Sequence, residues 1–381
     1  MNPEDFHSLQ AGKVVQTPRG YFAFIPSLQL PDINYDDHLV LALSHADTAL
    51  SELSGSGRHL PNPNLLITPY IRREAVLSSR IEGTKAELSD LWLGDIQGEE
   101  RHEGSADILE IRNYVTALEY GIQRLSTLPL SLRLVREIHA RLMEGGRGDQ
   151  ATPGEFRRSQ NWIGPAGCTL AEALYVPPPP DELMPALGKW EELLQDRDHF
   201  PDLIQSALIH ERFEAIHPFL DGNGRIGRLL ITLFLIERER LAQPLLYLSS
   251  YIEAHRQDYY ELLQRVRNHG DWNAWIVFFL SAVTETSHQA LRQTTILMDL
   301  RESYHRQLRG NPKAASLIDQ LFVTPYITVN LAEKALNTSN PTARKAIETL
   351  EKNGVLHEIT GREWGKIYLA GDIADAIQNP T

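Results

Sequence analysis

Apolar residues recur at spacings of three and four along much of the chain, which is the pattern of amphipathic helices. The pattern is clearest in three stretches, residues 108–118, 132–142 and 203–216. A strongly apolar stretch follows at residues 229–236. We therefore expect a mainly α-helical protein, in which residues 105–290 form a helical core and residues 291–310 form a connecting helix.

A further helix is expected in the N-terminal region, residues 1–104, at about residues 68–83. Thr68 can cap the start of this helix, and Pro69 suits the first helical position, where its missing N–H costs nothing. Gly83 suits the position that ends a helix.

The remainder of the N-terminal region is harder to interpret. An amphipathic stretch at residues 38–51 is followed by Ser-Gly-Ser-Gly at residues 54–57, which predicts a break. The role of residues 1–60 stays open.

Residues 160–177 interrupt the helical pattern with glycine and proline, and they cannot form one helix. Residues 161–163 and 173–176 have the composition of two short strands on either side of a turn. We therefore expect a β-hairpin inside the helical core.

The last part of the chain, residues 311–381, has a different pattern. Residues 331–336 and 341–353 predict two short helices, and residues 355–359 and 366–369 predict a two-stranded ribbon. Helix, turn, helix and ribbon together indicate a small C-terminal winged helix-turn-helix domain.

The charge of that domain bears on its partner. Residues 311–381 hold seven Lys and Arg against eight Asp and Glu, a net charge of −1. A domain that binds DNA is usually clearly basic. DNA binding by residues 311–381 is therefore open but not favoured, and a module for protein contact or for a homodimer is favoured.

Composition and charge narrow the class of protein further. Hydrophobic residues make up 42% of the chain, enough for a proper core, and the formal net charge is −13. The single cysteine, Cys168, excludes a disulfide framework and a zinc site of clustered cysteines. The N-terminus has no basic region followed by an apolar run, and no apolar stretch is long enough to span a membrane. We expect a soluble, cytoplasmic protein.

The densest group of chemically capable residues lies at residues 217–228, a glycine-rich loop that opens into an apolar helix. A helix N-terminus with glycines favours phosphate, and Arg225 and Arg228 can add charge-assisted bonds. Asp221 offers one carboxylate, which suits Mg²⁺ that is shared with substrate phosphates. His217 can take a proton near neutral pH. These groups together predict nucleotide-dependent transfer to a hydroxyl.

The pattern His-Pro-Phe-x-Asp-Gly-Asn-Gly-Arg-x-Gly-Arg at residues 217–228 resembles the signature of the Fic family of protein adenylyltransferases. The resemblance implies a Fic-type helical core in which His217 deprotonates a target hydroxyl that attacks the α-phosphate of ATP. It implies Mg²⁺ on Asp221 and the γ-phosphate on Arg228. The nucleotide contacts that it implies are Asp221, Gly222, Asn223, Gly224, Arg225, Ile226, Gly227 and Arg228.

The hairpin at residues 160–177 resembles the flap of that family, which clamps a target protein by strand addition. Ile163, Gly164 and Pro165 would then lie near the nucleotide. Without the motif at residues 217–228, a plain surface hairpin would be the preferred interpretation. Tyr259 is a further candidate for a nucleotide contact, and it fits a core aromatic equally well.

The end of the 68–83 helix resembles the inhibitory motif of Fic proteins, and Ser78, Glu82 and Gly83 match it. Its position before the core is that of the class with an N-terminal inhibitory helix. The resemblance implies that Glu82 pairs with Arg228 and so occupies the arginine that the γ-phosphate needs. An Arg–carboxylate pair in a partly desolvated site is among the stronger polar contacts.

Three alternatives remain at this point. The first keeps the fold but uses another nucleotide donor, and the second removes AMP from modified targets. The third is a DNA-binding regulator whose core senses a nucleotide, although a sensor does not need the general base His217. The expected partner is a target protein or the protein itself, with ATP as substrate and Mg²⁺ as cofactor.

Overall fold

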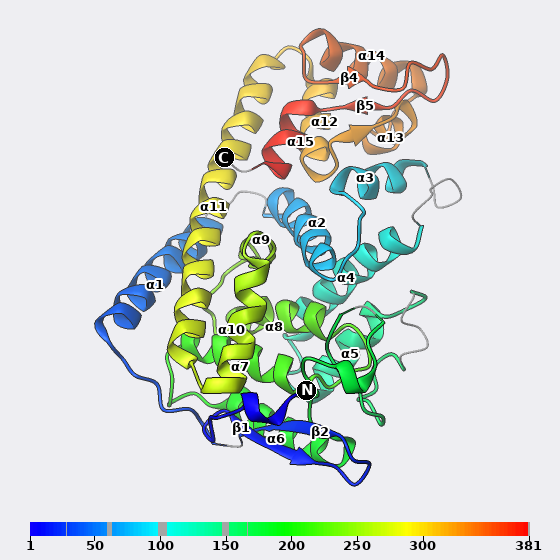
Figure 1. The fold of residues 1–381 in the computed structure, drawn as a ribbon. Coiled ribbons are helices and arrows are strands. Elements are labelled where there is room, and N and C mark those ends of the chain that lie inside the picture. Colours follow the sequence, from blue (N-terminus) through cyan, green and yellow to red (C-terminus); the bar gives the residue numbers. More distant parts are fainter. Residues whose placement is uncertain (28, 59–62, 98–104, 147–151, 166, 380–381) are drawn as a thin grey trace. The chain divides into compact units, whose positions relative to one another are not determined.

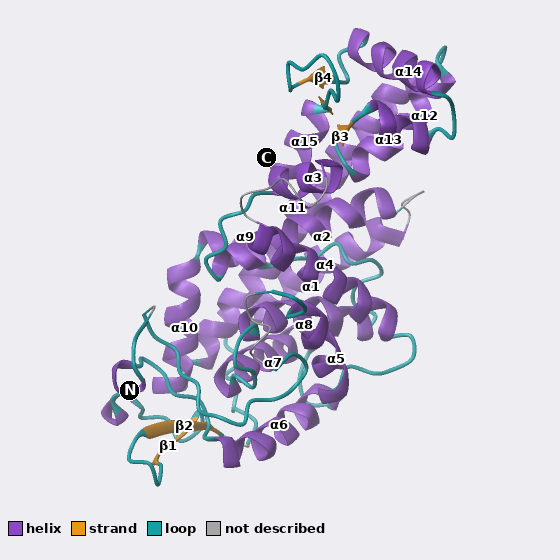
Figure 2. Ribbon diagram, turned by 90° about the vertical axis from the view of Figure 1, so that its right-hand side faces the viewer, coloured by secondary structure: helices purple, strands orange, loops and turns teal. Residues whose placement is uncertain are grey.

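A computed structural model describes the chain except residues 28, 59–62, 98–104, 147–151, 166, 380 and 381. The described residues form 15 α-helices, two small antiparallel sheets and short 3₁₀ turns, so the expected mainly α-helical class is confirmed (Figure 1). The few strands stand out among the helices when the ribbon is coloured by secondary structure (Figure 2). The residues fall into two compact units, which are described separately.

The first unit comprises Met1–Ser51, Asn113–Leu241 and Leu248–Glu285. Its elements are β1 (Gly12–Gln16), β2 (Phe22–Pro26), α5 (Leu132–Leu142), α6 (Pro180–Gln195), α7 (Asp202–Ile216), α8 (Asn223–Glu237), α9 (Ser249–Ala254) and α10 (Arg256–His269), with a 3₁₀ turn at each of Pro3–Asp5 and Leu170–Glu172.

The second unit comprises Glu52–Arg112, Ala242–Tyr247 and Thr286–Thr381. Its elements are α2 (Asn64–Ile81), α3 (Leu88–Gln97), α12 (Pro312–Val323), β3 (Tyr326–Ile327), α13 (Val329–Ala335), α14 (Asn340–Lys352), β4 (His357–Glu358), β5 (Tyr368–Leu369) and α15 (Gly371–Gln378). Three helices have residues in both units, namely α1 (Asp37–Arg58), α4 (Ser105–Arg124) and α11 (Trp272–Gln307).

The core of the first unit is built around α7, which packs against both α6 and α8. All residues of α7 from Leu203 to Ile216 are buried, including its polar ones. Buried polar groups must be hydrogen-bonded, and the Gln205 amide, for example, donates to the Leu193 carbonyl at 2.6 Å. A helix buried on all sides is held rigidly in place, and the predicted loop at residues 217–222 follows its last turn.

An N-terminal hairpin, which the sequence does not reveal, also belongs to this unit. Strands β1 and β2 pair antiparallel, with Val14 opposite Phe24. The Phe24 N–H donates to the Val176 carbonyl at 2.8 Å, and Phe24 packs with Tyr175 in a small apolar cluster. The hairpin therefore supports the end of the segment at residues 160–177 that was predicted to be a flap.

The second unit combines α2 with the C-terminal elements. Helix α2 packs against α12 and α15, and α3 packs against β3. Arg72 of α2 bonds the Asp95 carboxylate at 3.0 Å and the Thr324 hydroxyl at 3.3 Å. Strands β3, β5 and β4 form a three-stranded antiparallel sheet in that order. The two predicted helices of residues 311–381 correspond to α13 and α14, while the winged helix-turn-helix interpretation itself stays a prediction.

Three predicted local features differ from the structure. Helix α2 begins at Asn64 rather than at Thr68, so Pro69 lies inside the helix. Leu65 and Leu66 are buried, and their burial offsets the hydrogen bond that an internal proline removes. Helix α1 runs through the glycines at residues 54–57, because Gly57 packs closely beside Leu245, 3.2 Å from where a Cβ would lie.

The third difference concerns the hairpin at residues 160–177. The structure has one antiparallel bridge between Ile163 and Tyr175, in place of the expected three- and four-residue strands. Asn161 does not extend this pairing, because its side chain turns to the carbonyls of His217 and Phe219. The chain between the bridge residues contains the 3₁₀ turn at Leu170–Glu172.

Candidate functional site

The loop between α7 and α8 begins with an unusual backbone conformation. His217 caps α7 in the left-handed region, with φ 49° and ψ 61°, and its N–H donates to the Phe213 carbonyl at 2.9 Å. Gly222, with φ 78°, precedes α8. A left-handed histidine costs free energy and persists only where its surroundings fix it.

Two side chains from outside the loop fix the turn at His217. The Arg157 guanidinium donates from Nε to the His217 carbonyl at 2.9 Å and from Nη2 to the Pro178 carbonyl at 2.6 Å. The Asn161 amide donates to the carbonyls of His217 and Phe219 at 3.1 and 2.8 Å. Arg157 is buried, and burial lowers its pKa to about 10. The guanidinium therefore stays charged at neutral pH and ties the loop to the end of the hairpin at residues 160–177.

Asn223 stabilises the loop from inside. Its Oδ1 accepts from the Phe219 N–H at 2.8 Å, and its Nδ2 donates to the Phe219 carbonyl at 2.9 Å. The Phe219 ring stacks on the buried His139 ring, with centroids 3.7 Å apart. The Asn223 side chain thus shapes the loop, and its predicted contact with a nucleotide stays a prediction.

His139 carries one fixed tautomer. The Gly154 N–H donates to Nδ1 at 2.9 Å, so Nε2 bears the hydrogen and donates to the Asp221 carbonyl at 3.1 Å. Burial lowers the pKa of His139 to about 4, which keeps the ring neutral near pH 7. His139 therefore holds the Asp221 backbone without adding charge to the loop.

The start of α8 is an electropositive site. The first hydrogen bond into this helix runs from the Ile226 N–H to the Gly222 carbonyl at 3.0 Å, and the N–H groups that precede it have no acceptor within the helix. Arg225 and Arg228 belong to the first turns of α8 and are buried, with relative exposures of 5% and 3%. The helix dipole and the two guanidinium groups together favour an anion at this end.

Asp221 is the one acidic residue of residues 217–228. Its carboxylate is half exposed, lies 3.6 Å from Arg225 Nη2, and accepts the Gly222 N–H at 2.6 Å. In the described part of the chain, acidic, histidine and cysteine side chains form no group of three that could hold a metal by themselves. A single half-exposed carboxylate beside a helix N-terminus that favours anions fits Mg²⁺ that is shared with substrate phosphates.

Gly227 lets α7 and α8 approach closely. A Cβ at this position would lie 2.4 Å from Glu214 Oε1 and 3.3 Å from the His210 ring. His210 bonds the Gly227 carbonyl at 3.0 Å and the Tyr259 hydroxyl at 2.9 Å. Tyr259 is 1% exposed, so the structure places it in the core beside the site, and its role as a nucleotide contact stays a prediction.

The predicted flap residues lie on the bridge of the hairpin. The Ile163 N–H donates to the Tyr175 carbonyl at 2.9 Å, and the Tyr175 hydroxyl donates to the Ala215 carbonyl of α7 at 2.6 Å. Ile163 and Gly164 are half-buried and Pro165 is exposed. Leu174 is 66% exposed next to the bridge, so the hairpin presents an apolar side chain to solvent.

The predicted inhibitory residues lie at the end of α2 in the second unit. Ser78 is fully buried, and Glu82 is the C-cap, whose N–H donates to the Ser79 carbonyl at 3.1 Å. Gly83 has φ 99°, a conformation that glycine adopts at little cost. The predicted stop of this helix at Gly83 is confirmed.

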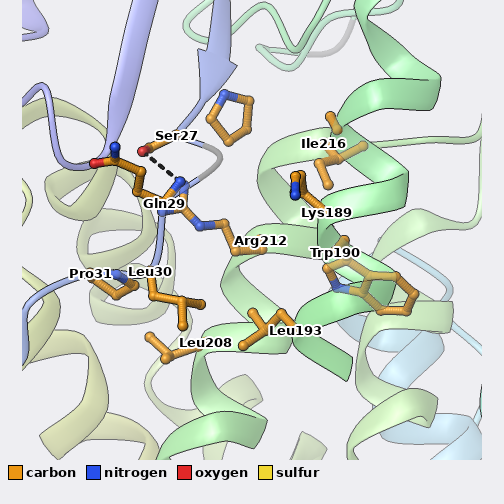
Figure 3. Close-up of a pocket in the computed structure, with 12 residues that line it drawn as sticks. Ser27, Gln29, Leu30, Pro31, Lys189, Trp190, Leu193, Leu208, Arg212 and Ile216 are labelled. Atoms are coloured by element: carbon orange, nitrogen blue, oxygen red, sulfur yellow. Dashed lines mark hydrogen bonds between the residues drawn. The ribbon is translucent and has the colours of Figure 1, made fainter. Parts of the chain in front are cut away.

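A small pocket of the first unit lies between α6, α7 and the chain after β2 (Figure 3). Trp190, Leu193, Leu208 and Arg212 line it, and the Gln29 N–H donates to the Ser27 hydroxyl at its edge. Its volume is about 30 Å³, whereas ligand sites usually measure several hundred Å³. The pocket is too small for a nucleotide, and its lining ends at α7 without including the loop at residues 217–228.

Sequence reasoning missed Arg157 and His139. They lie 60 and 82 residues from the loop carbonyls that they bind. Both stand among other polar residues in the sequence, and no pattern around them indicates a distant partner. A search for charged residues near the hairpin would have found Arg157, but nothing would have distinguished it from Arg158.

A helical core contains a glycine-opened loop after a buried helix, with a histidine at the loop entrance and an electropositive helix N-terminus behind it, which defines a helical class of fold with an anion-binding type of site. A family model described as Fic/DOC family N-terminal matches residues 40–123, and one described as Fic/DOC family matches residues 129–235. The two matches together span just over half of the chain. The protein belongs to the Fic/DOC family.

The chain also resembles curated proteins, but over only part of their length. The protein adenylyltransferase Fic of Aedes aegypti is 33% identical over 159 residues, 41% of this chain and 28% of the relative. That of Drosophila virilis is 30% identical over 223 residues, 56% of this chain and 42% of the relative. The chain therefore spans less than half the length of the curated relatives that it matches.

Solved structures share the fold. A Fic family protein from Desulfovibrio desulfuricans G20 superposes with a TM-score of 0.58 at 20% identity, over 90% of this chain and 98% of that protein. A Fic domain containing signaling protein from Bacteroides thetaiotaomicron superposes with a TM-score of 0.53 at 19% identity, over 66% of this chain and 96% of that protein. Among the described residues, none of the helices combines the length and apolarity that a membrane crossing requires.

Proposed function

We propose that this protein is an adenylyltransferase that moves AMP from ATP to a Tyr, Ser or Thr hydroxyl of a target protein or of itself. The observation that carries the proposal is the loop after α7, where His217 sits in a clamped left-handed turn directly before the electropositive start of α8. The relatives named protein adenylyltransferase Fic support the same chemistry.

In the proposed reaction, the His217 imidazole takes the proton of the target hydroxyl. The hydroxyl oxygen then forms a bond to the α-phosphorus of ATP, and the bond from that phosphorus to the oxygen bridging to the β-phosphate breaks. Pyrophosphate leaves, and AMP stays on the target. The start of α8, Arg225 and Arg228 would hold the phosphates, because transfer of this kind depends on positioning and charge stabilisation.

Asp221 would hold Mg²⁺ together with the phosphates. When bound there, the ion would neutralise charge on the phosphate oxygens. The half-exposed Asp221 carboxylate accepts the Gly222 N–H, and this hydrogen bond orients the carboxylate so that its oxygens could serve as metal ligands. Ile163, Gly164 and Pro165 would lie near the nucleotide and the target, with the hairpin adding a strand to the target's segment.

The proposal includes a brake. Glu82 would pair with Arg228 and displace the γ-phosphate, so that ATP would bind in a form unfit for in-line attack. The support is local: Glu82 ends α2 at a glycine-capped turn, and Arg228 is a buried guanidinium on α8. A carboxylate that reaches a buried arginine forms a strong bidentate pair.

The test uses ATP labelled at the α-phosphate, with Mg²⁺ and lysate proteins as targets. Glu82→Gly should incorporate at least about 10-fold more label than wild type, because the arginine is released. Adding His217→Ala to that variant should lower incorporation about 100-fold or more, because the general base is lost. The exposed His199 is the matched control, and His199→Ala should leave labelling unchanged. Full labelling by the His217→Ala variant would exclude the proposed chemistry, and equal rates for Glu82→Gly and wild type would exclude the brake.

A further inference from the structure

The C-terminal part of the second unit contains a groove of about 590 Å³. It lies between α13, the start of α14 and the loop from β4 to β5, and Ile96 of α3 also lines it. A volume of this size is in the range of binding sites. The groove shares no residue with the site at residues 217–228.

The groove is strongly basic. Lys334, Arg344, Arg362 and Lys366 line it, against the single carboxylate of Glu363. Residues 311–381 as a whole have a net charge of −1, so the cations are concentrated on this side.

Three of the eight carboxylates of residues 311–381 are bound within the fold. Asp319 accepts two bonds from Arg301, at 2.7 and 2.9 Å. Asp372 accepts from the Tyr304 hydroxyl at 2.9 Å, and Glu358 accepts from the Thr360 and Gly361 N–H groups. The net charge of the segment therefore does not describe the lining of the groove, where four cations face one carboxylate.

The other lining groups suit a nucleic acid. Asn340 and Arg344 lie four residues apart on one face of α14, a helix of 13 residues, and both line the groove. Trp364, in the loop after β4, also lines it and is 81% exposed. Clustered cations bind phosphates, the first turns of a helix can enter a major groove, and an exposed aromatic ring can contact sugars or bases.

We propose that this groove binds duplex DNA, with Lys334, Arg344, Arg362 and Lys366 on the phosphates and the first turns of α14 directed to the base edges. The binding is independent of the proposed adenylyl transfer. An acidic protein partner would use the same cations, but the regular spacing of phosphates along a duplex suits a row of side chains from a helix, its neighbour and a loop.

The affinity of such a site depends on salt, because bound phosphates release counterions. Four phosphate contacts predict a slope of log K against log salt of about −3.6. Between 50 and 200 mM NaCl the affinity for a labelled 20-base-pair duplex should therefore fall about 100-fold.

The experiment measures fluorescence anisotropy of that duplex with the full chain. Arg344→Ala/Lys366→Ala removes two lining cations and should weaken binding at least about 10-fold and reduce the slope by about 2. The matched control, Lys313→Ala/Lys352→Ala, removes two cations that do not line the groove, and its slope should equal that of wild type.

Three results would overturn the proposal. They are no salt-dependent binding by wild type at 50 mM NaCl, equal losses in the groove and control variants, and tighter binding of the matching single strand or of polyglutamate than of the duplex. A His217→Ala variant should bind the duplex as wild type does. Failure of adenylyl transfer with intact DNA binding, or the reverse, would separate the two proposals.

Discussion

The loop at residues 217–228 and the groove of the C-terminal segment are both positively charged, but they are built in opposite ways. The arginines of the first site, Arg225 and Arg228, are buried at the start of α8, and the buried Arg157 holds a backbone carbonyl of the loop before it. In the groove Lys334, Arg344 and Arg362 are exposed.

The difference fits the two roles that we propose. Transfer at one phosphorus atom would need atoms fixed to within a fraction of an ångström, and rigid burial supplies that precision. Holding a polyanion needs charge and little fixed geometry. Substitutions should therefore cost stability at the loop and cost only binding at the groove.

The largest effect is expected at Arg157. Arg157→Met keeps the volume but removes the guanidinium that donates to the Pro178 carbonyl, and it leaves the His217 carbonyl with Asn161 as its side-chain donor, so the free energy of unfolding should fall by roughly 3 kcal/mol. Adenylyl transfer should fall about 100-fold, mainly in kcat, because the His217 turn loses its position. Urea unfolding and initial rates measure the two effects.

Arg158 is the matched control for that prediction. Its side chain is 87% exposed and bonds Glu155 at 3.0 Å, so Arg158→Met should change stability by less than about 0.5 kcal/mol. Equal losses in the two variants, or a wild-type rate for Arg157→Met, would show that the turn holds without the buried guanidinium.

A smaller effect is expected where α7 and α8 meet. Gly227→Ala places a Cβ 2.4 Å from Glu214 Oε1 and should destabilise the fold by about 1–3 kcal/mol. Gly188 lies within α6, and the space that a Cβ would occupy there has no other heavy atom within 4 Å. Gly188→Ala should therefore stabilise the fold by about 0.5–1 kcal/mol. Thermal unfolding of both variants measures the opposite signs, and a shared sign would contradict the close approach.

The sequence predicted the features that depend on interactions between residues close together in the chain. The apolar spacing at residues 132–142 matches α5, and the motif at residues 217–228 lies where α7 gives way to α8. Both depend on residues that are neighbours in the chain. The periodicity of α7 predicted a single apolar stripe at residues 203–216, whereas its polar residues are buried as well, because two helices pack on it.

The features that depend on distant contacts were not predictable. Pro69 indicates a helix start by its chemistry, yet burial of Leu65 and Leu66 extends α2 beyond it. The left-handed turn of His217 depends on Arg157, 60 residues away. Net charge also fails as a guide to the C-terminal groove, because folding gathers four cations and one carboxylate along its lining.

The third prediction concerns pH. Burial lowers the pKa of His139 to about 4, and an unfolded histidine has a pKa of about 6.5. The unfolded state therefore binds the extra proton first, so this contribution to stability is complete above about pH 6.5 and is lost as pH falls toward 4. The slope is about 1.4 kcal/mol per pH unit for this one proton.

Urea unfolding at pH 7.5, 6.0 and 5.0 measures that slope. His139→Gln should unfold more easily at pH 7.5. Between pH 6.0 and 5.0, however, its free energy of unfolding should fall less steeply than that of wild type, by about the contribution of one proton. An unchanged slope in His139→Gln would show that other groups account for the acid sensitivity.

The smallest effect on stability is expected in the groove. Arg344→Ala and Trp364→Ala remove exposed side chains, so each should change the free energy of unfolding by less than about 0.5 kcal/mol while weakening duplex binding. Ile347, three residues further along α14, is 1% exposed, and Ile347→Ala should cost about 2–5 kcal/mol. Chemical denaturation of the three variants compares two exposed residues of the groove with a buried residue of α14. A loss above about 1 kcal/mol for Arg344→Ala or Trp364→Ala would mean that these side chains hold the segment together, and the contrast between a rigid loop and a tolerant groove would fail.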